Sequence, residues 1–241
     1  MTRIEGLRYV IDDLDIRSSV GRRMLFEREW SASPSELSNC FDHIEQLLTK
    51  VSDPRFESLR TKFLQLKDIS AVLRLLTEGG ILNDTDFFLI KSFILLYYDI
   101  CSCCEQMEFS VIVRRDLDSP LTLLDPDGHR VSAFRIYDSY SEELRHLRNE
   151  LKSCPDENRD RIFELISDCE EQIRCHLSAE LKQYTETICS ALNDSGYLDI
   201  VMAQAEQVVR LGFTRPELAD GDSTTDIGDY SSPRCRSRCV F

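Results

Sequence analysis

The sequence predicts a mainly α-helical protein, with a multi-helix core, one small β-hairpin and a long antiparallel pair of helices. The nine glycines and seven prolines gather between long stretches in which apolar residues recur every three or four positions, the spacing of one helix face. Hydrophobic residues make up 42% of the 241 positions, which is enough to form a sizeable core. One β-prone stretch lies near the middle of the chain, and the longest periodic stretch follows it.

The first third of the chain predicts a series of amphipathic helices. Ser33 is placed to cap the first of them, Pro34 suits its first position and Glu36 completes a capping box. A further helix restarts after the Asp53-Pro54 pair, and a short one follows it. We expect the short helix to stop at Gly79-Gly80, where positive φ is available.

The most apolar segment, residues 87–100, predicts a helix at the centre of the core. A polar start signal at 83–86 precedes it, and the helix is expected to run through Leu96 towards Cys104. Fourteen residues are too few to span a bilayer, and Lys91 lies inside the segment. Acidic residues also interrupt the N-terminal stretch where a signal peptide needs an apolar run. We therefore expect a soluble, cytoplasmic protein with no membrane contact.

Residues 109–136 depart from the helical pattern. The runs 121–124 and 131–136 are β-prone, and they flank the turn sequence Asp125-Pro126-Asp127-Gly128. This arrangement predicts the small hairpin.

Two long helices are predicted next. Ser139 and Glu142 form a capping box for the first, and a break at about 153–158 ends it. From about 158 to 192 one apolar face continues for roughly 35 residues, or about 50 Å. Such a helix fits a mechanical strut and a plain coiled coil equally well. We expect 193–196 to separate it from a last helix that ends at Gly212.

The pattern divides the chain into three regions: a helical core at 1–138, long helices that return to the core at 139–215, and a tail at 216–241. The tail is acidic up to about Ser232 and poor in large apolar groups, so we expect it to be disordered.

The net charge and the absence of known motifs argue against a catalytic or ligand-binding site in this chain. The formal charge of −14 disfavours unaided binding to nucleic acid. No glycine is followed by lysine, so the phosphate-binding P-loop is missing, and the four histidines are scattered. We therefore predict no catalytic, cofactor-binding or metal-binding residue, and no enzyme. The run Cys101-Ser-Cys103-Cys104 leaves a redox or metal-binding alternative open, although its flanks offer no further ligands.

Four segments, in order, resemble the core and lever domains of the MutS family of DNA mismatch-repair ATPases. They are residues 18–25, 80–93, 123–144 and 198–218, and the third carries the most specific match, LLDPDG followed by FRIYDSYSEEL. The resemblance assigns structural signature positions rather than a reaction centre: Gly21, Gly80, Asp84, Leu124, Asp125, Gly128, Asp138, Tyr140, Leu144, Ala203, Arg215 and Pro216.

The resemblance implies a non-catalytic module that couples an ATPase domain, in cis or in trans, to DNA or to a partner. The long helices would be its levers, and 125–139 its pivot. ATP and Mg²⁺ are expected only on that other domain, because no residue here matches its motifs. No DNA-gripping clamp separates the levers, so DNA contact is expected to be weak or indirect. The resemblance leaves room for a homodimer of the intact protein. A stand-alone helical adaptor that binds other proteins is the alternative.

Overall fold

The computed structural model describes residues 10–27, 33–153 and 155–216. Within these ranges the chain forms helices and no strand. The elements in chain order are α2 Ser19–Glu27, α3 Pro34–Leu48, α4 Pro54–Phe63, α5 Ser70–Thr77, α6 Asp84–Gln106, α7 Asp118–Leu124, the 3₁₀ turn η1 Asp138–Tyr140, α8 Glu142–Ser153, α9 Asp156–Leu181, the 3₁₀ turn η2 Lys182–Tyr184, and α10 Thr185–Leu211.

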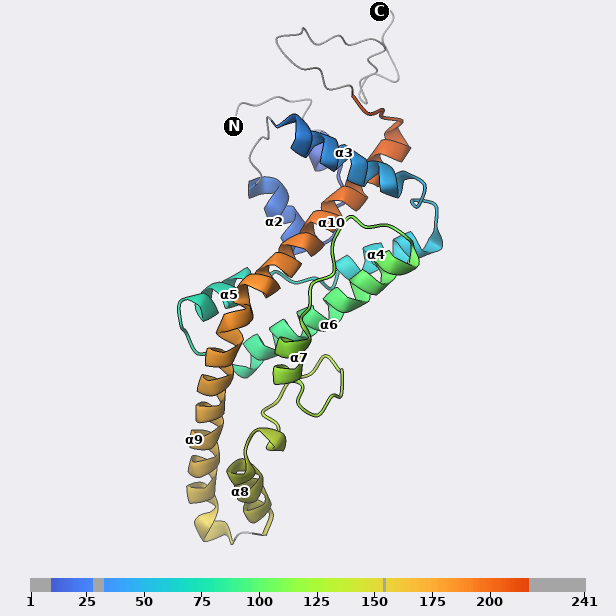
Figure 1. Ribbon diagram of the computed structural model, residues 1–241. Coiled ribbons are helices and arrows are strands. Elements are labelled where there is room, and N and C mark those ends of the chain that lie inside the picture. Colours follow the sequence, from blue (N-terminus) through green and yellow to red (C-terminus); the bar gives the residue numbers. More distant parts are fainter. Residues whose placement is uncertain (1–9, 28–32, 154, 217–241) are drawn as a thin grey trace, which may run out of the picture.

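The molecule is elongated, and α9 and α10 run along its length as one nearly continuous helix (Figure 1). At one end α8 packs beside α9, and at the other end α2 and α3 pack against α10. Between them, α4 and α7 pack against α6, while α10 contacts α4, α5 and α6. The region 139–215 therefore begins as an extension from the core and returns through its middle.

Helix α6 begins and packs as its sequence predicts. The Asn83 side chain accepts hydrogen bonds from the backbone of Thr85 and Asp86, and the Asp86 carboxylate accepts one from the Asn83 N–H, which completes a capping box. The 23-residue helix is long and apolar enough to cross a membrane by length and composition. Half of its most apolar window is buried among the other helices, as expected for the central helix of a core.

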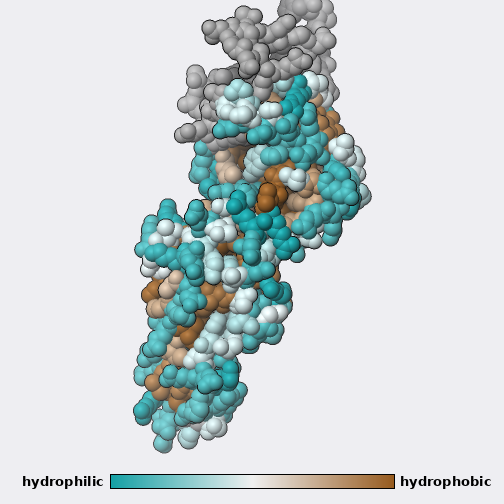
Figure 2. Space-filling model, viewed as in Figure 1, coloured by the Kyte–Doolittle hydropathy of each residue, from teal (hydrophilic) through white to brown (hydrophobic). Residues whose placement is uncertain are grey.

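Most of the buried apolar side chains belong to one cluster that extends through the core and along the α8–α9 pair. The face of the molecule seen in Figure 2 is mostly hydrophilic, with separate apolar areas along its length. This surface agrees with the charged residues that fill the outer faces of the amphipathic helices.

The predicted β-hairpin is wrong. Residues 121–124 lie in α7, and residues 131–136 form no strand. Pro120 is tolerated in the first turn of α7, and Leu121 and Leu124, three positions apart, are both fully buried. A β-prone apolar run this short can be buried equally well by a helix. The predicted turn is present, since Gly128 has φ +68° and donates its N–H to the Asp125 carbonyl at 2.9 Å.

The predicted break at 193–196 is also wrong, because α10 continues through it. The sequence Asn-Asp-Ser-Gly has the composition of a turn, but Ser195 donates its hydroxyl to the Ala191 carbonyl at 2.8 Å within the helix. At Gly196 a Cβ would lie 2.6 Å from the Met24 sulfur and 2.7 Å from a Val20 methyl. Gly196 therefore allows α2 to approach α10 closely instead of ending the helix.

Several predicted helix ends agree with the structure. Pro34 opens α3, and Gly212 ends α10 with φ +70°. The predicted cap of α3 is wrong, because the Ser33 side chain makes no capping hydrogen bond. The predicted cap of α8 by Ser139 is wrong. The Ser141 hydroxyl accepts the hydrogen bond there, from the Leu144 N–H at 3.2 Å. Apart from Pro216, the predicted acidic tail lies outside the described residues.

Candidate functional site

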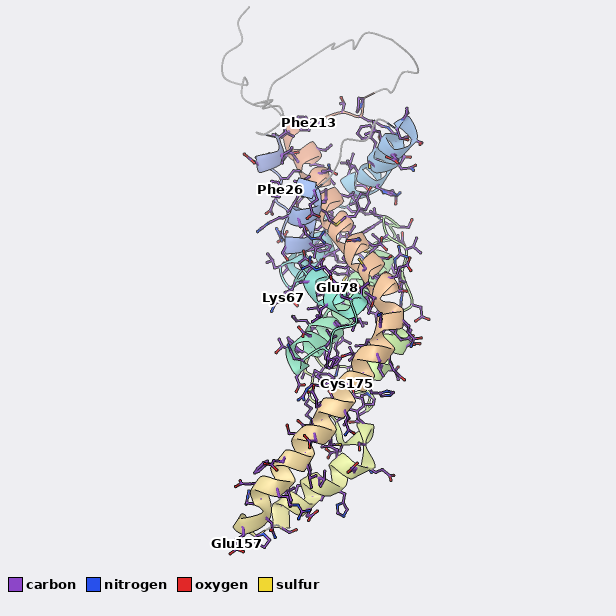
Figure 3. All side chains as sticks on the ribbon, turned by 90° about the vertical axis from the view of Figure 1, so that its left-hand side faces the viewer. Phe26, Lys67, Glu78, Glu157, Cys175 and Phe213 are labelled. Atoms are coloured by element: carbon purple, nitrogen blue, oxygen red, sulfur yellow. The ribbon has the colours of Figure 1, made fainter. Side chains whose placement is uncertain are left out.

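The candidate site is a helix with its anchoring contacts rather than a pocket of reactive groups. We call α9, η2 and α10 together the axial helix; it runs from Asp156 to Leu211. At 1.5 Å per residue its 56 residues extend roughly 80 Å. Figure 3 shows Glu157, near its start, and Phe213, just beyond its end, at opposite ends of the molecule.

A buried ionic cluster holds the α10 half of the axial helix to the core. The Asp199 carboxylate accepts from an Arg60 nitrogen at 2.6 Å, and from both the backbone N–H and the hydroxyl of Ser18 at 2.7 Å. The Arg60 and Asp199 side chains are both fully buried. We call Ser18, Arg60, Asp199 and Glu206 the Asp199 anchor.

Arg60 joins three parts of the chain in this anchor. Arg60 belongs to α4, and its guanidinium donates a hydrogen bond to the Asp15 carbonyl. A nitrogen of the same guanidinium lies 3.1 Å from the Glu206 carboxylate of α10. Burial raises the pKa of Glu206, and the nearby Arg60 charge offsets part of that rise. A buried arginine with several oxygen partners fixes the geometry around it, because losing one partner would leave a charge uncompensated.

A second buried ion pair lies where the chain enters α8. The Lys91 ammonium of α6 donates to the Asp125 carboxylate at 2.9 Å and to the Tyr137 hydroxyl at 3.0 Å. The Arg130 backbone N–H donates to the other Asp125 oxygen at 2.7 Å. We call Lys91, Asp125 and Tyr137 the Lys91 anchor.

The electrostatics of the Lys91 anchor favour an ionised Asp125. Burial acts to raise the pKa of Asp125, but the hydrogen bonds from Lys91 and from the Arg130 backbone, with the Lys91 charge, outweigh it. The net pKa of this carboxyl group is lowered from its ordinary value of 3.8. The pair therefore ties the turn after α7 to the central helix of the core.

The α8–α9 pair, which we call the arm, projects from this second anchor. Its inner face on α9 is a single stripe of buried residues: Ile162, Ile166, Cys169, Ile173, Leu177 and Leu181. Arg148 of α8 pairs with Glu170 of α9 at 2.8 Å and also with Asp138. These contacts, mostly at the edges of the stripe, set the register of the two helices.

The signature positions of the first and last resembling segments meet at the α10 end. At Gly21 an added Cβ would lie 2.9 Å from an Ile16 methyl and 3.0 Å from the Asp199 carboxylate, so a larger side chain there would crowd both. Ala203 is buried one helical turn beyond Asp199. Arg215 pairs with Asp42 at 2.6 Å and with Glu45 at 2.8 Å, both on α3.

The signature positions of the two middle segments gather at the arm and its base. Asp84, at the start of α6, pairs with Arg174 of α9 at 2.8 Å. The Tyr140 hydroxyl donates to the Leu123 carbonyl at 2.8 Å, and Leu144 is fully buried. The remaining signature positions of these segments stand at helix ends or in turns: Gly80, Leu124, Asp125, Gly128 and Asp138. The twelve positions thus form two groups, one at the base of the arm and one at the α10 end, with Pro216 in an apolar groove beside Arg215.

The cysteine run provides no metal centre within the described residues, where no group of three or more candidate ligand side chains lies together. Burial raises the pKa of Cys101 and of Cys104. Both thiols are therefore held in the protonated form, which is the poorer nucleophile and metal ligand. Cys235 and Cys239 lie outside the described residues.

Sequence reasoning missed the two anchors, although it noted some of their members. Lys91 and Asp199 each interrupt an apolar run, at FLIKSFIL and YLDIVMA. A lone charge in such a run signals a buried pair, since burying an unpaired charge is costly. Arg60 gave no comparable signal, because α4 is rich in charged residues, of which Arg55 is exposed and Lys62 is half-buried.

Comparisons with known proteins add no relative. No model of a known protein family matches the chain, and no curated protein matches it. The likeness to the MutS core and levers therefore rests on the four sequence segments described above.

Proposed function

We propose that this chain is the non-catalytic core and lever region of a MutS-like protein. In this proposal the axial helix transmits movement of an ATPase domain, in cis or in trans, to DNA or to a partner engaged elsewhere. ATP and Mg²⁺ would be bound by that other domain. The observation that carries the proposal is the axial helix, which runs from the tip of the arm to the α3 end of the core with one 3₁₀ turn in it.

Stiffness is what such a transmission element needs. Bending a helix costs packing and backbone hydrogen bonds, and the only irregularity in the axial helix is the single 3₁₀ turn at 182–184. A displacement at the α10 end would therefore be carried to the arm with little loss. The two anchors support this role, because they hold the helix and the arm base at two separated places.

The positions of the resembling segments also support the proposal. The first and last are about 180 residues apart, yet Ser18 donates to Asp199 between them. The second and third lie around α6, where Lys91 meets Asp125. Four segments that are related only by order in the sequence thus form two contacting pairs.

Helix α10 leads out of the core at the end where an ATPase domain would be attached or docked. Arg215 is held there by Asp42, Glu45 and Ser38 of α3. Movement transmitted through residues 213–216 would act on α3 and α10 together. The net charge of −14 makes direct DNA binding by this region weak.

The test is to isolate the native product from its own cells and to measure its intact mass and its associated proteins. The proposal expects either a product much heavier than the 27.9 kDa of this chain, containing a P-loop ATPase domain, or a complex with such an ATPase. A product of 27.9 kDa that recovers no ATPase would reject it.

The adaptor alternative is favoured by one feature of the arm. Phe163 and Leu165 of α9 are 49% and 43% exposed, and they lie two positions apart beside the buried stripe of the arm. An adaptor would bind a partner protein there. Loss of a specific partner in a Phe163→Ser variant, with no ATPase in the complex, would support the adaptor over the lever.

A further inference from the structure

A cavity that is open to solvent lies on one side of the core, and neither anchor uses it. It has a volume of about 660 Å³ and lies between α6, the α4–α5 connection, α7 and residues 130–132. This size falls within the range of pockets that hold small organic ligands, about 300–1,000 Å³. The cavity is separate from the axial helix, since none of its lining residues belongs to α9 or α10.

One wall of the cavity is apolar and comes from the exposed side of α6. Phe88, Leu89, Leu95 and Leu96 line it. These residues accommodate a hydrocarbon chain or an aromatic ring, and burying such a group would remove apolar surface from water.

A polar atom in this wall lacks a partner. The Ser92 hydroxyl oxygen is buried and makes no hydrogen bond within the described part of the chain. Ser92 lines the cavity together with the apolar residues. A buried hydroxyl without a partner is uncommon in folded proteins, and water or a bound ligand usually satisfies it.

The charged residues around the cavity favour an anion. Lys67 and Arg130 line it, and neither side chain has an ion pair or hydrogen bond among the residues that the structure describes. Lys67 lies at the outer edge of the core (Figure 3). Arg114 lies over the Tyr98 ring at 4.7 Å, with only a 3.8 Å contact to Glu105.

Two acidic residues also line the cavity, and each is already engaged. Asp99 pairs with Lys62 at 3.4 Å, and Asp118 accepts a hydrogen bond from the Tyr98 hydroxyl at 3.0 Å. The three lining cations, Lys67, Arg114 and Arg130, exceed these two carboxylates by one, so the lining carries a net positive charge. This is unusual in a chain whose formal charge is −14.

We propose that this cavity binds a small amphipathic carboxylate, with its apolar body against α6 and its anionic group near Lys67 and Arg130. Such a ligand would contact α6 and the segment that leads from α7 to α8 at the same time. It would therefore stabilise the folded core in proportion to its concentration. The proposal does not depend on the lever function.

The experiment titrates decanoate, below its micellar concentration, into the full chain by isothermal calorimetry. Decan-1-ol provides the matched uncharged probe. The expected result is saturable binding of one decanoate per chain, at least about tenfold tighter than binding of the alcohol, as one or two partly screened charge contacts would give.

The charge-removing variant Lys67→Gln with Arg130→Gln is expected to weaken decanoate binding about tenfold and to leave the circular dichroism spectrum unchanged. Lys182→Gln removes an exposed charge outside the cavity and serves as the control, with affinity unchanged. Ser92→Met, which extends a side chain into the cavity, is expected to abolish saturable binding.

Four outcomes would overturn the proposal. Decanol that binds as tightly as decanoate would show that the anionic group is not recognised. Full affinity in the double variant would place the bound molecule elsewhere. An absence of saturable binding would leave water as the partner of Ser92. Competition by an acidic hexapeptide that binds more tightly than decanoate would make the cavity a peptide site.

Discussion

The two halves of the axial helix are built differently. Helix α10 is buried on several sides, with thirteen buried residues that include Ser195, Gly196, Asp199 and Gln207. Helix α9 has one buried stripe against α8 and the core, and most of the rest of its surface is charged or polar, with Phe163 and Leu165 exposed among these residues. The α10 half is therefore fixed by packing from α2, α3 and the core helices, whereas the α9 half depends mainly on one neighbour along most of its length.

The comparison shows how one helix can be both anchored and projecting. Small residues in α10 allow close approach of other helices, and a buried ion pair defines its position. In α9 the single stripe gives enough burial to keep the helix formed but leaves its outer face in water. Perturbations in α10 should thus affect the whole molecule, while those in α9 should act locally.

The largest expected effect comes from breaking the Asp199 anchor. Arg60→Met would leave the buried Asp199 carboxylate without its cation, and we expect it to lower the free energy of unfolding by about 3–5 kcal/mol. Urea unfolding followed by circular dichroism measures this change.

The matched control is the double variant Arg60→Met with Asp199→Leu. It removes both charges, so we expect it to recover a large part of the lost stability. A double variant that is less stable than Arg60→Met alone would contradict the view that an uncompensated charge causes the loss.

Breaking the Lys91 anchor is expected to have a smaller effect. Lys91→Met would leave one carboxylate, Asp125, without its cation, whereas Arg60→Met leaves both Asp199 and Glu206 without theirs. We therefore expect a loss of about 2–3 kcal/mol at pH 7, measured by urea unfolding.

The same variant makes a prediction about pH. The folded pKa of Asp125 lies below its ordinary value of 3.8, so its stabilising contribution is present above that value and is lost as the pH falls through the lower folded pKa. The stability difference between the wild type and Lys91→Met should therefore shrink below about pH 4. A difference that stays constant from pH 7 to pH 3 would rule out this assignment.

The close approach of α2 to α10 at Gly196 can be tested by a steric change. Gly196→Ala would place a Cβ against Met24 and Val20, and we expect it to cost about 1–3 kcal/mol and to loosen α2. Because alanine otherwise favours a helix interior, an increase in stability would show that α2 does not approach α10 closely. Thermal unfolding gives the cost, and amide exchange in residues 19–27 reports the loosening.

The smallest effect is expected on the arm. Arg174→Ala removes a partly exposed pair with Asp84 and should cost about 0.5–1 kcal/mol. Hydrogen exchange is expected to quicken in α9 and to stay unchanged in residues 191–205. Equal changes in both halves would contradict their different construction.

The sequence predicted the features that depend on local pattern. The start of α6, its central position and the end of α10 at Gly212 agree with the structure. The hairpin and the break at 193–196 were wrong because tertiary packing decided both: buried Leu121 and Leu124 favour a helix, and Gly196 meets α2. The Arg60–Asp199 pair joins residues 139 positions apart, which no local pattern can relate.

We infer that α9 and α10 behave as one rigid element. The most direct test is pulsed electron paramagnetic resonance between spin labels placed at Gln172 and Val209 through a genetically encoded amino acid, which avoids the ten cysteines. Both sites are exposed on the axial helix. A rigid axial helix gives one narrow distance of roughly 55 Å, from 37 residues at 1.5 Å each. A broad distribution, or a main distance far shorter than this, would show a hinge near η2 and would contradict the rigid axial helix.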